Sequence, residues 1–146
     1  MPSNLRVIAV DPGKKRTGIA IGETRTGMAS PFKTLTGSFE HVVGLIANII
    51  RKERIDIVLL GRPEMPNGME HAITRLSDNF AEKLRATGAI VISYDEHLSS
   101  FAAEEYLKER GISYSKDKGI VDRTAAALLL EQAIREGIFV SLLEQP

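Results

Sequence analysis

Four acidic residues stand where segments of the chain begin or end. Asp11 ends the first apolar run, Asp95 and Glu96 follow the last one, and Asp122 lies near the start of the final helical pattern. Carboxylates that meet at one site repel each other unless a cation lies between them, and all-oxygen ligation favours Mg²⁺ or Mn²⁺ over zinc. Two such ions can activate a water and stabilise the leaving oxygen of a phosphodiester. The chemistry predicted from these residues is therefore metal-dependent hydrolytic phosphoryl transfer.

Each acid alone also has an ordinary structural explanation. An aspartate before Pro12-Gly13 is a common turn former, and Asp122 is suited to the positive end of a helix. Consecutive strand residues point to opposite faces, so only one of Asp95 and Glu96 can reach a shared cluster. The spacing of the residues does not decide which one it is.

The hydrophobic pattern predicts the elements that position these acids. Apolar or alternating runs predict strands, and apolar residues at helical spacing predict helices between and after them. Pro31 places the third strand at a sheet edge, and Ser38 is a plausible N-cap for the first helix. Three successive strands followed by β-α-β units predict an α/β fold with a mixed, five-stranded sheet flanked by helices. The predicted strands are 5–10, 17–22, 27–35, 55–60 and 89–94, and the predicted helices are 39–50, 73–84, 100–110 and 120–136.

Length and composition indicate one globular domain, residues 1–146. Hydrophobic residues make up 43% of the chain and charged residues 26%, which is typical of a chain that forms a packed core. The absence of cysteine excludes disulfides and thiol catalysis and suits a cytoplasmic location. Neither a signal peptide nor a bilayer-spanning stretch is expected from the apolar runs.

The net charge of zero lowers the expectation that the chain binds nucleic acid, because phosphate contacts usually come from an excess of Lys and Arg. Local basic patches at 14–16, 51–54 and 116–118, the last together with Arg123, can still supply positive charge. Solvated surface charge is an equally good explanation for each patch alone.

Four motifs in order resemble the YqgF family, also called RuvX, of pre-16S rRNA nucleases and Holliday junction resolvases. They are VIAVDPGKKRTGIAIGE, DIVLLGRPEMPNG, YDEHLSS and KGIVDRTAAALLLEQAI, and the similarity covers nearly the whole chain. The resemblance implies a ribonuclease-H-like fold. Matched residue by residue, it implies that Asp11, Glu96 and Asp122 are the catalytic acids and the ligands of Mg²⁺ or Mn²⁺, with two ions expected. This favours Glu96 over Asp95.

The resemblance also implies that basic residues lie beside the cleft. Three positions depart from the family pattern: Lys14 replaces a threonine, Arg62 a leucine and His97 an arginine. The histidine puts one phosphate contact in doubt, and the two added cations could restore charge nearby. The residues predicted to bind substrate are Lys14, Lys15, Arg16, Arg62, His97, Lys118 and Arg123.

The substrate expected is the 5′ region of precursor 16S rRNA, with a four-way DNA junction as the alternative. A junction resolvase makes two symmetrical cuts and normally needs a stable basic dimer, whereas this neutral chain has no obvious dimerisation stripe and is expected to be a monomer or weak homodimer. A module that binds RNA or protein without cutting is a second alternative. An actin-like ATPase is disfavoured, because so short a chain lacks the second lobe that such proteins need.

Overall fold

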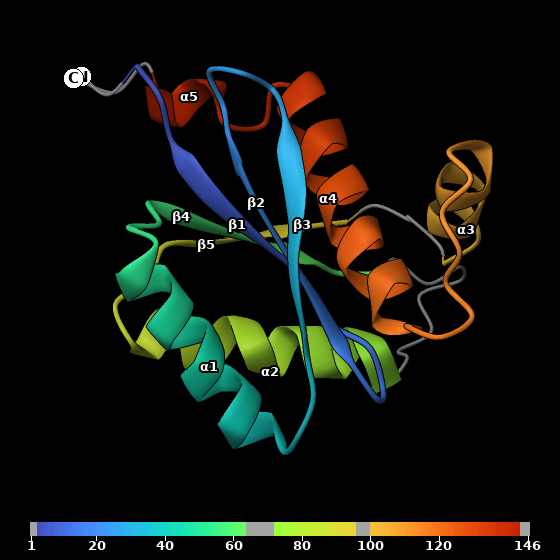
Figure 1. Ribbon diagram of the computed structural model, residues 1–146. Helices are drawn as coiled ribbons and strands as arrows, with labels where there is room; N and C mark the ends of the chain where they lie inside the picture. Colours follow the sequence, from blue (N-terminus) through green and yellow to red (C-terminus); the bar gives the residue numbers. More distant parts are fainter. Residues whose placement is uncertain (1–2, 64–71, 96–99, 144–146) are drawn as a thin grey trace, which may run out of the picture.

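The computed structural model describes residues 3–63, 72–95 and 100–143 (Figure 1). Its centre is a mixed sheet of five strands in the order β3-β2-β1-β4-β5, in which β1 pairs antiparallel with β2 and parallel with β4. This confirms the predicted sheet and the predicted order of elements. The strands are β1 (Arg6–Asp11), β2 (Thr17–Glu23), β3 (Ala29–Leu35), β4 (Ile57–Gly61) and β5 (Val91–Tyr94).

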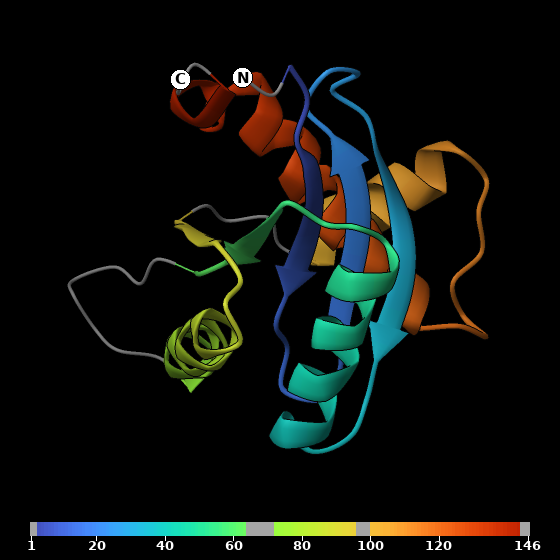
Figure 2. The same ribbon diagram turned by 90° about the vertical axis from the view of Figure 1, so that its left-hand side faces the viewer.

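The helices cover both faces of the sheet. In Figure 2, α1 and α2 lie together on one side of the strands and α4 lies on the other. α3 packs against α4 and lies beside the sheet (Figure 1). The helices are α1 (Phe39–Lys52), α2 (Ala72–Ala86), α3 (Ser100–Glu109), α4 (Gly119–Arg135) and the short α5 (Val140–Leu143), which the sequence pattern did not predict.

Strand β1 is buried on both faces, as its unbroken apolar run predicts. Ile8 and Val10 pack with residues of α1 and α2, while Val7 and Ala9 pack with residues of α4. Because side chains alternate along a strand, Asp11 follows Val7 and Ala9 onto the α4 side. The alternation in β1 therefore directs the first acid toward the last long helix.

Local sequence signals account for the edge strand and for the first helix. Pro31 lies in β3, which is an edge strand of the sheet, opposite Ala20 and next to a shift in the β2–β3 register. The Ser38 hydroxyl accepts a hydrogen bond from the backbone N–H of His41, which satisfies one of the free donors at the start of α1. Both sequence predictions are confirmed.

The predicted inner face of the last helix is only partly correct. Ala125 and Leu129 are buried as expected, but Val121 and Leu128 are only half-buried. A run of alanines and Leu130 takes the inner positions instead, because the helix lies so close to β2 that small side chains fill the interface.

Within the described ranges, no helix is both long and apolar enough to cross a membrane.

Candidate active site

Asp11 is the half-buried acid at the end of β1, directly opposite Gly18 of β2. Burial, and to a lesser extent the negative charge of Asp122, raises the pKa of Asp11 from 3.8 to about 7. Asp122 lies at the same point of the sheet, because its backbone packs on Gly18, the residue opposite Asp11, so two of the three predicted catalytic acids are close together. The structure therefore brings together residues that are 111 positions apart in the chain.

Gly18 explains how α4 reaches this end of the sheet. A Cβ atom at Gly18 would lie only 2.0 Å from the backbone carbonyl oxygen of Asp122 and 2.9 Å from the backbone nitrogen of Arg123. Only a residue without a side chain leaves room for the helix backbone at this contact. One turn earlier, the Thr34 hydroxyl of β3 donates a hydrogen bond to the carbonyl of Gly119. These two contacts hold the start of α4 against the hairpin and set the position of Asp122.

The end of β4 forms another side of the site. A Cβ atom at Gly61 would lie 3.6 Å from the Oδ1 atom of Asp11 and 3.0 Å from a methyl group of Leu129. The carboxyl end of β4 is therefore close to the carboxylate of Asp11. Ligand sites in open α/β sheets usually lie at the carboxyl ends of parallel strands, so this is the expected place for a reaction centre.

Arg16 contacts one of the acids directly. Its Nε donates to the Oδ2 atom of Asp122 at 2.6 Å, and both side chains are partly exposed. The resemblance implied that Arg16 lies beside the cleft; in the structure its partner is the acid Asp122. The guanidinium thus compensates part of the negative charge that Asp11 and Asp122 create together.

The structure separates Asp95 from this pair of acids. Asp95 is exposed and lies 3.6 Å from a guanidinium nitrogen of Arg62, whose Nε also contacts Asp78 of α2 at 2.8 Å. Asp95 is therefore associated with the α2 side of the sheet. The predicted third acid, Glu96, and the neighbouring His97 lie outside the described residues.

Besides Arg16, which pairs with Asp122, and His97, which is not described, the residues predicted to bind substrate fall into two groups. Arg62 is held by Asp78 and Asp95, and Arg123 binds Asp117 at 2.6 Å and the Thr34 hydroxyl at 3.2 Å. Three others are exposed and have no ion-pair partner among the residues that the structure describes: Lys14, Lys15 and Lys118. Their charges remain available to an anion, whereas those of the two arginines are already matched by carboxylates.

The carboxylates of this site suit a metal cation, although the described residues alone do not provide a complete set of metal ligands. They contain no group of three or more side chains from His, Cys, Asp and Glu that could hold a metal ion. Asp11 and Asp122 supply two carboxylates whose mutual repulsion a hard cation would relieve, and oxygen donors are the ligands that Mg²⁺ and Mn²⁺ prefer. The proposed third ligand, Glu96, belongs to a segment that is not described.

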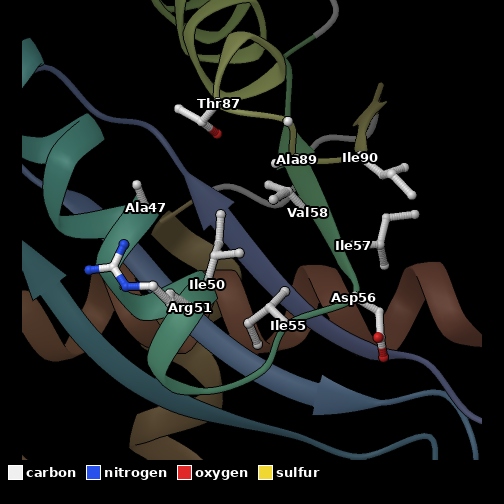
Figure 3. Close-up of a pocket in the computed structure, with 11 residues that line it drawn as sticks. Ala47, Ile50, Arg51, Ile55, Asp56, Ile57, Val58, Thr87, Ala89 and Ile90 are labelled. Carbon is white, nitrogen blue, oxygen red and sulfur yellow. The ribbon is translucent and has the colours of Figure 1, made fainter.

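A pocket of about 390 Å³ lies at the opposite end of the parallel strands (Figure 3). It is bordered by the start of β4 at Ile57, by Ile90 before β5 and by the last turn of α1 at Ile50. Its lining is mostly aliphatic, and the pair of acids is not part of it. The position and the lining both argue that this pocket is not the reaction centre.

Sequence reasoning missed three features of the site. It did not predict the Arg16–Asp122 ion pair, the capture of Arg62 by Asp78, or the near contact of Gly18 with the helix backbone. The glycine left a trace in the sequence, because residues 18, 20 and 22 form a face of small residues on the second strand. The two ion pairs depend on the tertiary fold, so no local sequence pattern indicates them.

Comparisons with known proteins show which family the chain matches. The family model described as "RuvX: Holliday junction resolvase" matches residues 5–136. A protein of Methylobacillus flagellatus named "Putative pre-16S rRNA nuclease" is 36% identical over 127 residues, covering 86% of this chain and 87% of its own length. A protein of the same name from Trichormus variabilis is 33% identical over 135 residues, covering 90% and 89%.

Solved structures show the same fold. The structure of T. thermophilus RuvC in complex with a Holliday junction substrate superposes with a TM-score of 0.59, covering 92% of this chain and 97% of that one. The two sequences are 17% identical, so the similarity concerns the fold. The mixed five-stranded sheet with its flanking helices is thus the ribonuclease-H-like fold that the sequence resemblance implied.

Proposed function

The chain belongs to the RuvX family, and from this premise we propose that it is a metal-dependent nuclease that hydrolyses phosphodiester bonds, with precursor 16S rRNA as its substrate. The observation that carries the proposal is the meeting of Asp11 and Asp122 at the carboxyl end of β1. Two carboxylates in one half-buried site are costly without a compensating cation, and a nuclease of this type needs such a cation.

Different residues of the chain have different roles in the proposed reaction. Asp11, Asp122 and Glu96 would hold the divalent ions, Mg²⁺ or Mn²⁺, through carboxylate oxygens. Bound ions of this kind supply an activated water and stabilise the leaving oxygen of the phosphodiester. Asp11 must be ionised to bind a cation, and its raised pKa makes cation binding release a proton near neutral pH. Arg16 neutralises Asp122 until a cation or a phosphate competes for it.

The assignment of Glu96 as the third acid is supported by the contact that the neighbouring Asp95 makes. Asp95 is directed to Arg62 and so to the α2 side, whereas Asp11 and Asp122 are on the α4 side. Asp95 is therefore not available to the pair of acids, which removes the competing assignment. This argument agrees with the family resemblance, which also selects Glu96.

The unpaired cations are suited to the phosphates of the substrate. Lys14 and Lys15 belong to the β1–β2 loop that follows Asp11, and Lys118 lies directly before α4, four positions from Asp122, so each acid has an exposed lysine near it in the chain that forms no ion pair with the described residues. Contacts of lysine with phosphates position a nucleic acid without selecting its sequence. Arg62, His97 and Arg123 complete the proposed binding set, with the two arginines acting only after their carboxylate partners release them.

Precursor 16S rRNA is favoured over branched DNA because the two relatives described above are named as pre-16S rRNA nucleases and the chain is neutral overall. The family description favours the alternative, resolution of a four-way DNA junction. A role in rRNA maturation would place the protein in the cytoplasm, where it would act as a monomer or weak homodimer. A binding module that does not cut is the remaining alternative, and the low net charge is the observation in its favour.

The test of substrate class offers both nucleic acids to one preparation of protein. Wild type and Asp11→Asn are incubated with a precursor 16S rRNA fragment or with a four-way DNA junction, in Mg²⁺ and in Mn²⁺. We expect cleavage of the RNA by wild type only. Paired, symmetrical cuts in the junction without RNA cleavage would establish the resolvase alternative, and no cleavage of either would favour the binding module.

A further inference from the structure

A second, smaller pocket lies beneath the β1–β2 loop, beside the proposed reaction centre. It measures about 180 Å³ and is lined by loop residues 13–17 and by side chains of β3, α1 and α2. Pockets for drug-sized ligands usually measure about 300–1,000 Å³, so this one suits a single small ring system rather than a whole nucleotide. We call it the loop pocket.

The inner wall of the loop pocket is apolar and partly aromatic. Phe80 of α2 is 1% exposed, and the ring of Phe39 at the start of α1 is half-buried against it, with 4.8 Å between the ring centroids and an angle of 57° between the planes. Leu76 of α2, also half-buried, lines the same space. Phe80 is covered, so the partly exposed ring of Phe39 and the side chain of Leu76 form the surface on which a flat, weakly hydrated ring can pack.

The mouth of the loop pocket is positively charged. Lys14 and Lys15 line it and are exposed, without an ion-pair partner among the residues that the structure describes. An apolar pocket with a cationic mouth matches a ligand that joins a flat ring to a phosphate. A fatty acyl chain or an apolar side chain of a partner protein would leave the two charges unused.

The loop pocket opens on the α1 and α2 side of the sheet and the pair of acids lies on the α4 side, and the β1–β2 loop with Arg16 connects the two. This residue lines the pocket and also contacts the Asp122 carboxylate at 2.6 Å, and Gly13 of the pocket is two positions from Asp11. The pocket mouth and the acids therefore share the β1–β2 loop, and a strand with a phosphate at the acids has the pocket next to it across this loop.

We propose that the loop pocket binds one unpaired base of the substrate strand, from a nucleotide near the one that is cut. The inference rests on the proposed nuclease function and extends it. A base in a duplex is stacked and paired and cannot enter such a pocket, so the enzyme requires an unpaired nucleotide at a fixed distance from the cleavage point. The pocket has an apolar floor without a fixed polar pattern, so it selects an unstacked base rather than a particular base.

The test scans the substrate with single abasic nucleotides. RNA affinity is measured in Ca²⁺ for a precursor 16S rRNA fragment in which one base at a time is missing. Loss of a base–aromatic stack weakens binding by about 5- to 100-fold, and we expect this loss at one position, at a constant offset from the cut. In Leu76→Phe, which fills the pocket, intact RNA should bind as weakly as the critical abasic RNA binds to wild type, with no further loss at that position.

A spectroscopic measurement keeps the proposal testable if the filled variant does not fold. 2-Aminopurine replaces the base at each position in turn, and its fluorescence should change on binding to wild type at the same single position. Uniform abasic effects along the strand, or an equal loss in wild type and in a folded Leu76→Phe, would overturn the loop pocket proposal. If wild type cuts the RNA normally in that case, the nuclease function stands and only the pocket assignment fails. Absence of RNA binding would overturn both.

Discussion

Replacing Asp11 with asparagine is expected to stabilise the metal-free protein at neutral and alkaline pH. The folded protein raises the pKa of Asp11 from 3.8 to about 7, because its carboxylate is half-buried and faces Asp122. Above pH 7 the folded state therefore carries a charge that the unfolded chain solvates better. Asparagine has a similar shape and never ionises, so it removes this cost.

The magnitude follows from the two pKa values. Each pH unit by which a pKa differs between the folded and unfolded states corresponds to about 1.4 kcal/mol, so the upper limit at pH 8 is about 4 kcal/mol. Partial exposure of the site and the nearby Arg16 guanidinium reduce it to about 2–3 kcal/mol. The cost is absent below pH 4, grows as the pH rises from 4 to 7 and is complete above that, so the gain in the variant follows the same course.

The assay is urea unfolding in EDTA at pH 4.5 and pH 8 for wild type and Asp11→Asn. The difference in unfolding free energy between the two proteins should be larger at pH 8 by about 1.5–2 kcal/mol, because about a quarter of the cost is already present at pH 4.5. Mg²⁺ should stabilise wild type more than the variant, because cation binding removes the same repulsion. Asp95→Asn, at an exposed acid of the same sheet edge, is the control. A gain of equal size at both pH values, or no gain, would refute the reasoning from burial and repulsion.

Three further predictions concern residues around the acids. Gly18→Ala should destabilise the protein by about 1–3 kcal/mol and abolish cleavage, because its Cβ would push the backbone at Asp122 away from β1. The control is Gly44→Ala, at an open position on α1, which should be neutral or stabilising in the same unfolding assay. Arg16→Gln should lower the unfolding free energy of the metal-free protein, and Mg²⁺ should restore most of the loss, since a cation takes over the role of the guanidinium. An equal loss with and without Mg²⁺ would contradict this role of Arg16. Lys15→Ala should weaken RNA binding and make its dependence on salt shallower by about one phosphate contact, and an unchanged salt slope would show that the lysine is only solvated.

Much of the fold could be predicted from the sequence because its signals are local. The unbroken apolar run of β1 predicts a central strand, Pro31 predicts an edge and Ser38 predicts a helix start. The prediction was less accurate for α4, where the closeness of the helix to β2 decides which side chains are buried. Val121 and Leu128 are apolar and at suitable spacing, yet alanines occupy the tightest positions.

The candidate site was predictable in outline for the same reason. Asp11 and Asp122 lie at the ends of elements that the hydrophobic pattern identifies, and strand ends converge in this class of fold. The partners of the charged residues were not predictable. Arg16 lies 106 positions from Asp122, and Arg62 lies 16 positions from Asp78, so each pairing depends on how the helices pack on the sheet.

The central claim is that the acid pair, together with Glu96 and divalent ions, cuts a phosphodiester. Its most direct test is the single-turnover cleavage of a precursor 16S rRNA fragment in Mg²⁺ by wild type, Asp11→Asn and Asp122→Asn, at protein concentrations that saturate the RNA as measured in Ca²⁺. We predict cleavage by wild type, and no cleavage above the protein-free background by either variant although both bind the RNA and remain folded. Cleavage at the wild-type rate by either folded variant would contradict the claim.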